Sequence, residues 1–470
     1  MRRAVLLVAC WSLTACLGTP YQRPKLDIPA QYRFTLSEAQ RPADVQWWSS
    51  FGDPVLDELV LEALRNNEDL RIAAARVDEF HGAMVTTRAP IFPSVGYAAS
   101  SGQNKPSAQV VGKGNDVVAN SSAAGFTAGW EIDVWGKIRN QTAAASADWR
   151  ASDADRRAAV LTLVSAVTSG YLTLLSLDDQ LRTSEATLAS RRKALDVFEK
   201  RYKGGVISKV ELSQARYQYE VAAAAVPVLQ EQIARQEDAL SLLLGRNPGP
   251  IARGRVLLEL GTPIVPPGLP SDILVQRPDV VSAEQSLIAA NARVSAARAL
   301  YFPSISLTGL LGVASLDLNK LFDGGSGTWS YAGQATGPIF QGGSNVGVNE
   351  QADARREQLL ANYEKTVQGA FADVDDALIA TQKSTERTEA QRLQVEALGD
   401  YARLARKRYE GGYSSYLEVL DAENSLFNAQ LLYSQGQRDR FIAHVDLYKA
   451  LGGGWVDAAA AKAPQPQYVP

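Results

Sequence analysis

The side chains that most often perform catalysis or bind metals are scarce in this sequence of 470 residues. It holds two histidines, His81 and His444, and two cysteines, Cys10 and Cys16. A zinc or thiol site needs several such ligands close together, so we expect no metal site and no catalytic residue. The Gly-x-Ser-x-Gly, His-Glu-x-x-His, Walker and Rossmann patterns are also missing from the sequence. An enzyme is therefore the least favoured class of function, and no cofactor is expected.

Cys16 is the residue whose surroundings predict a specific covalent reaction. A positively charged start and an apolar stretch lead to Leu-Thr-Ala-Cys at residues 13–16, which resembles a signal peptide ending in a bacterial lipobox. We expect residues 1–15 to be removed and a lipid to be attached to Cys16, with residues 16–46 as a lipidated tether. A plain signal peptide with an incidental cysteine is the alternative. The following Leu17, in place of aspartate, resembles the outer-membrane sorting signal of lipoproteins.

Charge and hydropathy restrict the remaining classes. The chain has 48 Lys and Arg against 51 Asp and Glu, so its net charge is 48 − 51 = −3, and no nucleic-acid partner is expected. Beyond the signal, no stretch approaches the roughly 20 unbroken apolar residues of a spanning helix. If the mature chain crosses a membrane, it must cross as β-strands.

An internal duplication organises the chain. The sequence KRYKGG at residues 200–205 returns as KRYEGG at residues 407–412, an offset of 207 that neighbouring residues share. We therefore predict two structural repeats, residues 47–250 and 271–455, each with a short helix, two strands and a long helical hairpin. A linker at residues 251–270 joins them. The Ala- and Pro-rich tail, residues 456–470, is predicted to be disordered.

Each repeat contains a proline-free stretch with a helical pattern. We predict long helices over 142–203 and 349–410, each 62 residues or roughly 93 Å, followed by returning helices over 208–244 and 415–451. A seven-residue spacing of mostly apolar residues in both long helices predicts left-handed coiled-coil packing. These positions are Val160, Val167, Leu174, Leu181, Leu188, Leu195 and Tyr202, and then Val367, Val374, Thr381, Thr388, Val395, Ala402 and Tyr409.

Four segments alternate apolar and polar residues and predict strands. They lie at 95–100, 126–134, 305–313 and 329–336, joined in pairs by loops at 102–120 and 315–327. A half-buried sheet of a soluble protein is the alternative for any one of them. Together with the lipoprotein signal, they favour a membrane barrel with a polar lumen and an aromatic girdle. The girdle candidates are Tyr97, Phe126, Trp130, Trp329 and Tyr331.

Four strands cannot close a barrel, because bacterial barrels need at least about 8 and lipid excludes open sheet edges. The chain must therefore form an oligomer. Two copies would give a barrel whose lumen is filled by side chains, whereas three copies would leave a passage. Three pairs of helical hairpins would also surround a tube, so the pattern favours a conduit.

Several stretches resemble the OprM-type outer membrane factors of the TolC superfamily, which serve tripartite multidrug efflux systems. They are residues 21–24 (YQRP), 47–48 (WW), 51–56 (FGDPVL), 130–136 (WEIDVWG), 269–272 (LPSD), 277–279 (RPD), 302–307 (FPSISL) and 447–455 (LYKALGGGW). The resemblance implies an α+β membrane protein that forms a homotrimer. Its twelve-stranded outer-membrane barrel would continue into a periplasmic α-helical coiled-coil barrel, with a periplasmic adaptor and an inner-membrane RND pump as partners.

The resemblance also implies two functional regions. The hairpin turns would form periplasmic tips that contact the adaptor; the matching residues are Arg201, Tyr202, Gly204, Gly205 and Ser208, and then Arg408, Tyr409, Gly411, Gly412 and Ser415. Helix capping alone would also explain these residues. Leu417 and Asp421, four residues apart on one helix face, would form apolar and acidic rings that close the periplasmic mouth. A packed leucine and a solvated aspartate are the alternative there.

The function expected from this resemblance is a passive outer-membrane conduit for drugs or other small toxic compounds. Two alternatives remain. The first is a TolC-like channel for secreted proteins, and the second is a lipid-anchored coiled-coil scaffold without a pore. The scaffold would explain the lipobox and the heptads, but it would not explain four strands that recur in a duplicated order.

Overall fold

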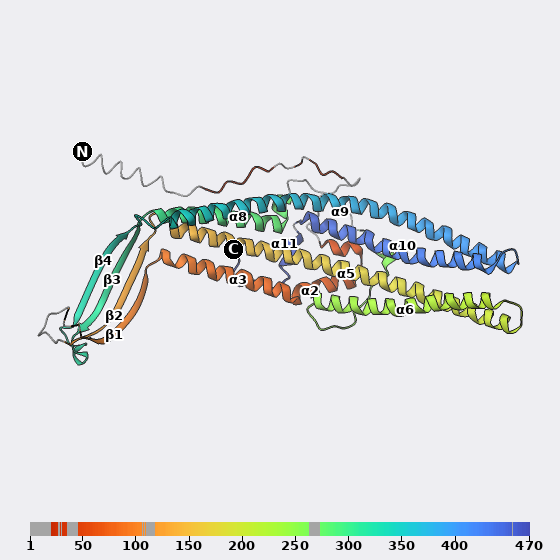
Figure 1. The fold of residues 1–470 in the computed structure, drawn as a ribbon, viewed down its shortest axis with the longest axis horizontal. Coiled ribbons are helices and arrows are strands. Elements are labelled where there is room, and N and C mark those ends of the chain that lie inside the picture. Colours follow the sequence, from red (N-terminus) through yellow and green to blue (C-terminus); the bar gives the residue numbers. More distant parts are fainter. Residues whose placement is uncertain are drawn as a thin grey trace.

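The computed structural model describes residues 20–26, 29, 31–34, 46–105, 107, 109, 118–262, 273–453 and 455–470. Within them the molecule is long and narrow, with a sheet at one end and two helical turns at the other (Figure 1). The first half contains η2 (Trp47–Phe51), α2 (Pro54–Asn66), α3 (Glu68–Arg88), η3 (Ala89–Ile91), β1 (Ser94–Asn104), β2 (Ala119–Ile132), α5 (Lys137–Lys203) and α6 (Lys209–Leu243). The second half contains η4 (Leu257–Glu259), α7 (Ile273–Gln276), α8 (Pro278–Arg298), η6 (Ala299–Tyr301), β3 (Ser304–Ser315), η7 (Leu318–Lys320), β4 (Gly327–Thr336), α9 (Ser344–Glu410), α10 (Tyr416–Leu451) and α11 (Trp455–Ala460). The order of elements confirms the duplication.

The two long helices begin earlier than predicted. α5 and α9 each contain 67 residues, about 100 Å at 1.5 Å per residue. Each follows a glycine with positive φ, Gly136 at 76° and Gly343 at 89°. The Asp133 carboxylate accepts hydrogen bonds from the backbone amides of Ile138 at 3.0 Å and Arg139 at 2.8 Å. Asp133 therefore caps α5, which explains why β2 ends at Ile132 and not at residue 134.

The heptad positions lie mainly inside the helical layer. Nine of the fourteen are buried: Val160, Val167, Leu174, Leu195, Val367, Val374, Thr381, Thr388 and Ala402. Tyr202, the last heptad position of α5, is exposed, because the helix ends at the next residue. α5 also has one apolar window long enough to span a membrane, but 61% of that window is buried inside the chain. Its apolar character therefore serves the core of the helical layer.

The helices form a single layer in which the two repeats lie side by side. Near the sheet, α3 packs on α5, α5 on α8, and α8 on α9. Toward the turns, α6 replaces α3 and α10 replaces α8 as neighbours of the long helices (Figure 1). In each repeat, a side chain at the start of the short helix binds the end of the returning helix. Asn67 Nδ2, before α3, donates to the Leu243 carbonyl of α6 at 3.0 Å, and Arg277 Nη1, before α8, donates to the Ala450 carbonyl of α10 at 3.0 Å.

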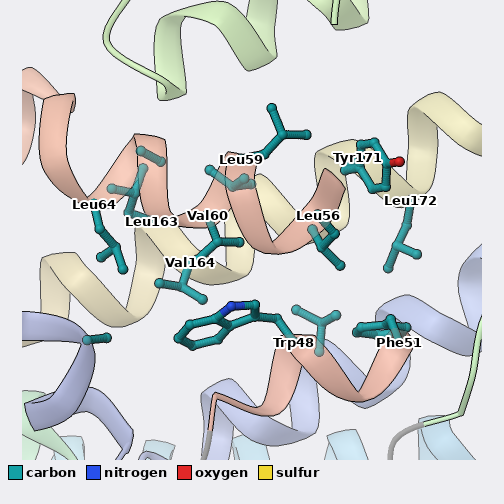
Figure 2. Packing of buried hydrophobic residues seen from close by; sticks show 14 of the residues in the cluster. Trp48, Phe51, Leu56, Leu59, Val60, Leu64, Leu163, Val164, Tyr171 and Leu172 are labelled. Atoms are coloured by element: carbon teal, nitrogen blue, oxygen red, sulfur yellow. The ribbon is translucent and has the colours of Figure 1, made fainter. Parts of the chain in front are cut away.

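An aromatic core lies at the middle of the helical layer. Trp47 stacks on Tyr448 with ring centroids 4.8 Å apart, and Trp455 meets both Trp47 and Trp48 edge to face at 5.8 and 5.9 Å. Figure 2 shows Trp48 of η2 beside side chains of α2 and α5, including Val60 and Val164. The first and last described helical turns of the chain are therefore joined in one cluster.

The tail after residue 455 is ordered, so the prediction of disorder was wrong. Ala463 joins the central core together with α11. The backbone amides of Gln467 and Tyr468 donate to the Asp78 carboxylate at 3.1 and 3.0 Å, and Tyr468 stacks on His81 at 4.0 Å. The composition was misleading because a segment rich in alanine and proline is typical of flexible linkers, whereas here the small alanine side chains pack into the core.

The four predicted strands are confirmed as one antiparallel sheet in the order β1-β2-β3-β4. β1 and β2 extend beyond the predicted segments, to Asn104 and back to Ala119, and so shorten the loop between them. η7 lies within the predicted loop at 315–327. Glycines at the paired positions Gly125 and Gly312 let β2 and β3 approach closely: a Cβ added at Gly125 would lie 2.8 Å from Gly312 Cα.

Candidate functional site

The two hairpin turns have the same backbone geometry. After α5, Gly205 adopts a φ of 72°, and the amide of Val206 donates to the Arg201 carbonyl at 2.9 Å. After α9, Gly412 adopts a φ of 75°, and Tyr413 donates to the Arg408 carbonyl at 2.9 Å. Only the second glycine of each pair needs positive φ, since Gly204 and Gly411 are helical in conformation. These bonds satisfy the last helical carbonyls.

The two predicted serine caps differ. Ser208 forms a capping box, accepting from the Glu211 amide at 3.2 Å while its own amide donates to the Glu211 carboxylate at 2.7 Å. Ser415 occupies the N-cap of α10 but makes no side-chain cap bond, so the expected cap is wrong there. Glu418, in the place of Glu211, forms an ion pair with Arg408 at 3.4 Å. The second turn has an ion pair where the first has a capping box.

The turns are joined to each other across the repeats. Arg201 Nη1 donates to the Tyr409 hydroxyl at 3.0 Å, and the Tyr409 ring lies 5.2 Å from the Tyr416 ring. Tyr416 packs on Phe198 of α5 at 4.3 Å, and burial raises the pKa of its hydroxyl to about 12. Arg201 and Tyr409 therefore hold the two hairpins together, while Tyr202 faces solvent.

Arg191 is a buried connection that we did not predict. Its guanidinium on α5 donates to the Gln218 carbonyl of α6 and to Asn424 Oδ1 of α10, both at 2.8 Å. Burial lowers the pKa of Arg191. The sequence did carry a signal, because Arg191 lies three residues after Leu188 and four before Leu195, on the heptad face.

The two gate candidates lie on a part of α10 that no other segment of the described chain covers. Leu417 is 60% exposed, and Asp421 is exposed as well. Tyr401 of α9 faces this region: burial and the carboxylates of Asp421 and Glu418 raise the pKa of its hydroxyl. Leu417 and Asp421 lie about one turn apart on α10, and rings of these side chains require further copies of the chain.

The girdle candidates share one face of the sheet. Tyr97, Phe126 and Trp329 lie in one row through Leu311, and the large aromatic side chains of this face are exposed. Trp130 donates from Nε1 to the Ile91 carbonyl at 2.9 Å. Tyr97 and Trp130 lie toward the ends of β1 and β2 that adjoin the helices, whereas Trp329 and Tyr331 lie in the half of β4 farther from the helices. The five aromatics therefore share one face of the sheet but do not form a belt at its helical end.

The segment that follows the predicted lipid site is held on α8. Arg23 forms a bidentate ion pair with Glu284, and the Tyr21 hydroxyl donates to the same carboxylate at 3.2 Å. Cys16 itself, the signal peptide and most of the tether lie outside the described residues, as do residues 263–270 of the predicted linker. Among the described residues, no three His, Cys, Asp or Glu side chains gather to hold a metal ion.

Comparison with known proteins agrees with this architecture. Residues 59–246 and 269–453 match the family described as Outer membrane efflux protein. The chain is 36% identical over 461 residues to the toluene efflux pump outer membrane protein TtgC of Pseudomonas putida, covering 96% of this chain and 95% of that one. It is 35% identical over 451 residues to the cation efflux system protein CusC of Escherichia coli, covering 94% and 97%.

A solved structure extends the likeness to three dimensions. The open-state MtrE outer membrane channel of Neisseria gonorrhoeae is 30% identical, and the superposition covers 93% of this chain and 98% of that one with a TM-score of 0.85. Both matched segments contain two strands and a long helical hairpin. The chain therefore belongs to the outer membrane efflux protein family, and it is an outer-membrane efflux channel with the TolC-type fold.

Proposed function

We propose that three copies of this chain assemble into a continuous tube through the outer membrane and the periplasm. The observation that carries this proposal is the sheet, in which β1 and β4 are edge strands without a further partner in the described chain. Lipid excludes such edges, so strands of other copies must pair with them. Three copies supply twelve strands, and a barrel of that size leaves a passage.

The helical layer supports the same assembly. Its free edges toward the turns are α6 and α9, since α5 and α10 lie between them. α6 exposes Val210 and Tyr217 by about two thirds, and α9 exposes Leu393 and Leu404 by about half. These two edges are different surfaces, so α6 of one copy would meet α9 of the next, an arrangement that closes a ring.

The tube would be the exit duct of a tripartite pump, with an adaptor at the turns and an inner-membrane RND pump as the energy source. The turns present solvent-exposed apolar side chains, including Val206, Tyr413 and Tyr202. Exposed aromatic and apolar groups on a turn are suited to a protein partner. Arg201, Tyr409 and the turn glycines would act mainly by fixing the shape of this contact surface.

The narrowest part of the tube would be formed by Leu417 and Asp421. Three copies would place three leucines and three carboxylates around the axis near the turns, as apolar and acidic rings. Replacing both residues by alanine is expected to raise single-channel conductance in planar bilayers. Leu432→Ala, which removes an equally apolar and half-exposed side chain farther along α10, is the matched control. Unchanged conductance of the double variant would contradict the gate.

Organic cargo is the class that we propose, although one relative belongs to a cation efflux system. Soft cations such as Cu⁺ are bound by thiolate, thioether and imidazole groups, and the mature chain offers few of them: Met84, His81, His444 and Cys16. His81 is stacked on Tyr468, and His444 is buried. The toluene efflux protein among the relatives suggests apolar organic compounds. Export of a protein is the alternative cargo for the same tube.

A lipid on Cys16 would anchor each copy beside the barrel. Tyr21 and Arg23 bind Glu284 on α8, and Cys16 lies five residues before Tyr21. An extended chain spans at most about 3.6 Å per residue, so the backbone of the lipidated cysteine would lie within about 18 Å of Tyr21. Globomycin, which blocks lipoprotein signal cleavage, should leave a precursor, and Cys16→Ser should abolish acyl labelling.

The assembly is tested by crosslinking across the proposed α6–α9 interface. The mature chain has no thiol besides Cys16, so introduced cysteines are unique. Val221→Cys combined with Leu393→Cys is expected to give a three-chain product with a short bismaleimide. Ala222→Cys, buried against its own chain, is the control partner for Leu393→Cys and should give monomer. A two-chain product as the largest species would contradict the trimer, and absent conductance of the purified trimer would contradict the conduit.

A further inference from the structure

A cavity of about 900 Å³ lies beside the sheet, on one face of the helical layer. All four helices of that region contribute to its wall: α3, α5, α8 and α9 (Figure 1). A hollow that touches four neighbouring helices of one layer lies on the concave side of that layer. The polar and charged residues of its wall include Thr87, Gln141, Asp148, Arg293 and Arg355.

Helix geometry places the segments at residues 21–23 and 467–468 on the face of the helical layer opposite to the cavity. Asp78, which binds the C-terminal segment, and Thr87, which lines the cavity, are nine residues apart on α3. Nine residues are two and a half turns at about 3.6 residues per turn, so these side chains point in opposite directions. The same spacing separates Glu284, which binds Arg23, from Arg293 of the cavity on α8.

The cavity therefore faces the lumen of the proposed tube. The segment at Tyr21 and Arg23 follows the lipidated residue by a few positions, and a lipid anchored in the membrane around the barrel keeps this segment outside. The face opposite to it is the inside. Each copy would contribute one such cavity, just below the barrel.

The chemistry of the cavity combines an apolar surface with an excess of positive charge. Alanines from all four helices give a smooth floor, and Phe80, Leu300 and Val348 add larger apolar side chains. Two guanidinium groups, on Arg293 and Arg355, face a single carboxylate, which pairs with Arg293. Among the residues that the structure describes, Arg355 donates only to the Gln358 side chain, at 3.0 Å, and none of them neutralises its charge.

We propose that this cavity is a binding site for small amphipathic anions inside the channel. The apolar part of such a molecule would lie on the alanine floor. Its anionic group would bind the guanidinium of Arg355 and the side of the Arg293 guanidinium that faces away from Asp148. Alkyl and aromatic carboxylates or sulfonates have this chemistry. The inference rests on the proposed conduit and names a class of cargo that would be retained briefly near the exit.

The probe that tests the site is 1-naphthalenesulfonate, added on the barrel side of single trimers in planar bilayers. It is expected to interrupt the ion current for resolvable times. Two control probes separate the requirements of the site. Methanesulfonate has the charge without the rings, and 1-naphthylmethylammonium has the rings with the opposite charge. Both should interrupt the current far less.

Three variants locate the site. Arg355→Gln is expected to weaken the block by about tenfold, because a hydrogen bond to a charged group is lost. Ala352→Phe places a ring in the cavity and should abolish the block without removing a charge. Arg150→Gln is the matched control, because Arg150 is exposed and lies nine residues from Gln141, on the opposite face of α5; its block should equal that of the wild type.

The outcomes separate this proposal from the one on which it rests. A conducting trimer that the anion blocks no better than the cation would overturn the binding site and leave the conduit intact. Equal block of the wild type, Arg355→Gln and Ala352→Phe would do the same. A trimer without any conductance would overturn the conduit and the binding site together.

Discussion

Arg201 on α5 donates a hydrogen bond to the hydroxyl of Tyr409 on α9, with Nη1 and Oη 3.0 Å apart. The two residues belong to corresponding turns of the two repeats, one position out of register. This contact links the two hairpins close to their turns, and Tyr416, which contacts the Tyr409 ring, also packs on Phe198. The residues that resemble adaptor contacts in sequence thus also fix the separation of the two turns.

Tyr409→Phe should loosen this link while keeping the ring against Tyr416. A hydrogen bond of this kind contributes about 1 kcal/mol, so the population with separated turns is expected to rise about fivefold. The open probability of single channels measures this change. Tyr202→Phe makes the same replacement at the corresponding position of the first repeat and should have little effect. An equal response of both variants would contradict a specific role for the Arg201–Tyr409 bond.

The two N-cap serines should differ in their effect on the turns. Ser208→Ala removes a capping box and is expected to destabilise the start of α6 by about 1 kcal/mol. Ser415→Ala removes no side-chain cap bond, so the start of α10 should be nearly unaffected. Hydrogen exchange of the amides at 209–213 and 416–420 reports each helix start separately. Faster exchange at 416–420 in Ser415→Ala, as large as that at 209–213 in Ser208→Ala, would contradict the assignment.

The spacing of residues along the sequence made most of the fold predictable. The features that the sequence analysis missed depend mainly on contacts between elements far apart in the chain. The repeat, the long helices and the strands depend on local spacing, which the sequence displays directly. Arg191 was missed because its partners Gln218 and Asn424 come from two other helices. The ordered tail was missed for the same reason: Ala463 joins a core that also contains Trp47 and Val160, more than 300 positions away, and no local pattern records that neighbourhood.

Gly125 and Gly312 should be intolerant of any side chain. They pair across β2 and β3, and a Cβ at Gly312 would lie 2.3 Å from the Ala124 carbonyl oxygen. Gly125→Ala and Gly312→Ala are therefore expected to reduce the heat-resistant trimer on unboiled gels, because the strands must separate. Gly102→Ala in β1, where a Cβ would meet nothing within 4 Å, is the control. Normal trimer yield for Gly312→Ala would show that the sheet adjusts at little cost.

His444 should make the stability of the assembled channel depend on pH. It is 7% exposed on α10, and its Nδ1 lies 2.8 Å from the Arg440 carbonyl. Burial lowers the pKa of His444 below its ordinary value of 6.5. The hydrogen bond to the Arg440 carbonyl raises this pKa and the Arg440 charge lowers it, but both effects are smaller than that of burial. The unfolded chain therefore binds the proton more readily, so stability is complete above pH 6.5 and decreases as pH falls below it.

The loss cannot exceed about 1.4 kcal/mol per pH unit for one proton per chain. His444→Gln keeps a hydrogen-bond donor but cannot titrate, so its melting temperature should fall less than that of the wild type between pH 7.5 and pH 5. Above pH 7.5 the two slopes should agree, because histidine is neutral in both the folded and the unfolded chain. Parallel pH profiles of the two proteins throughout this range would exclude His444 as the source of the acid sensitivity.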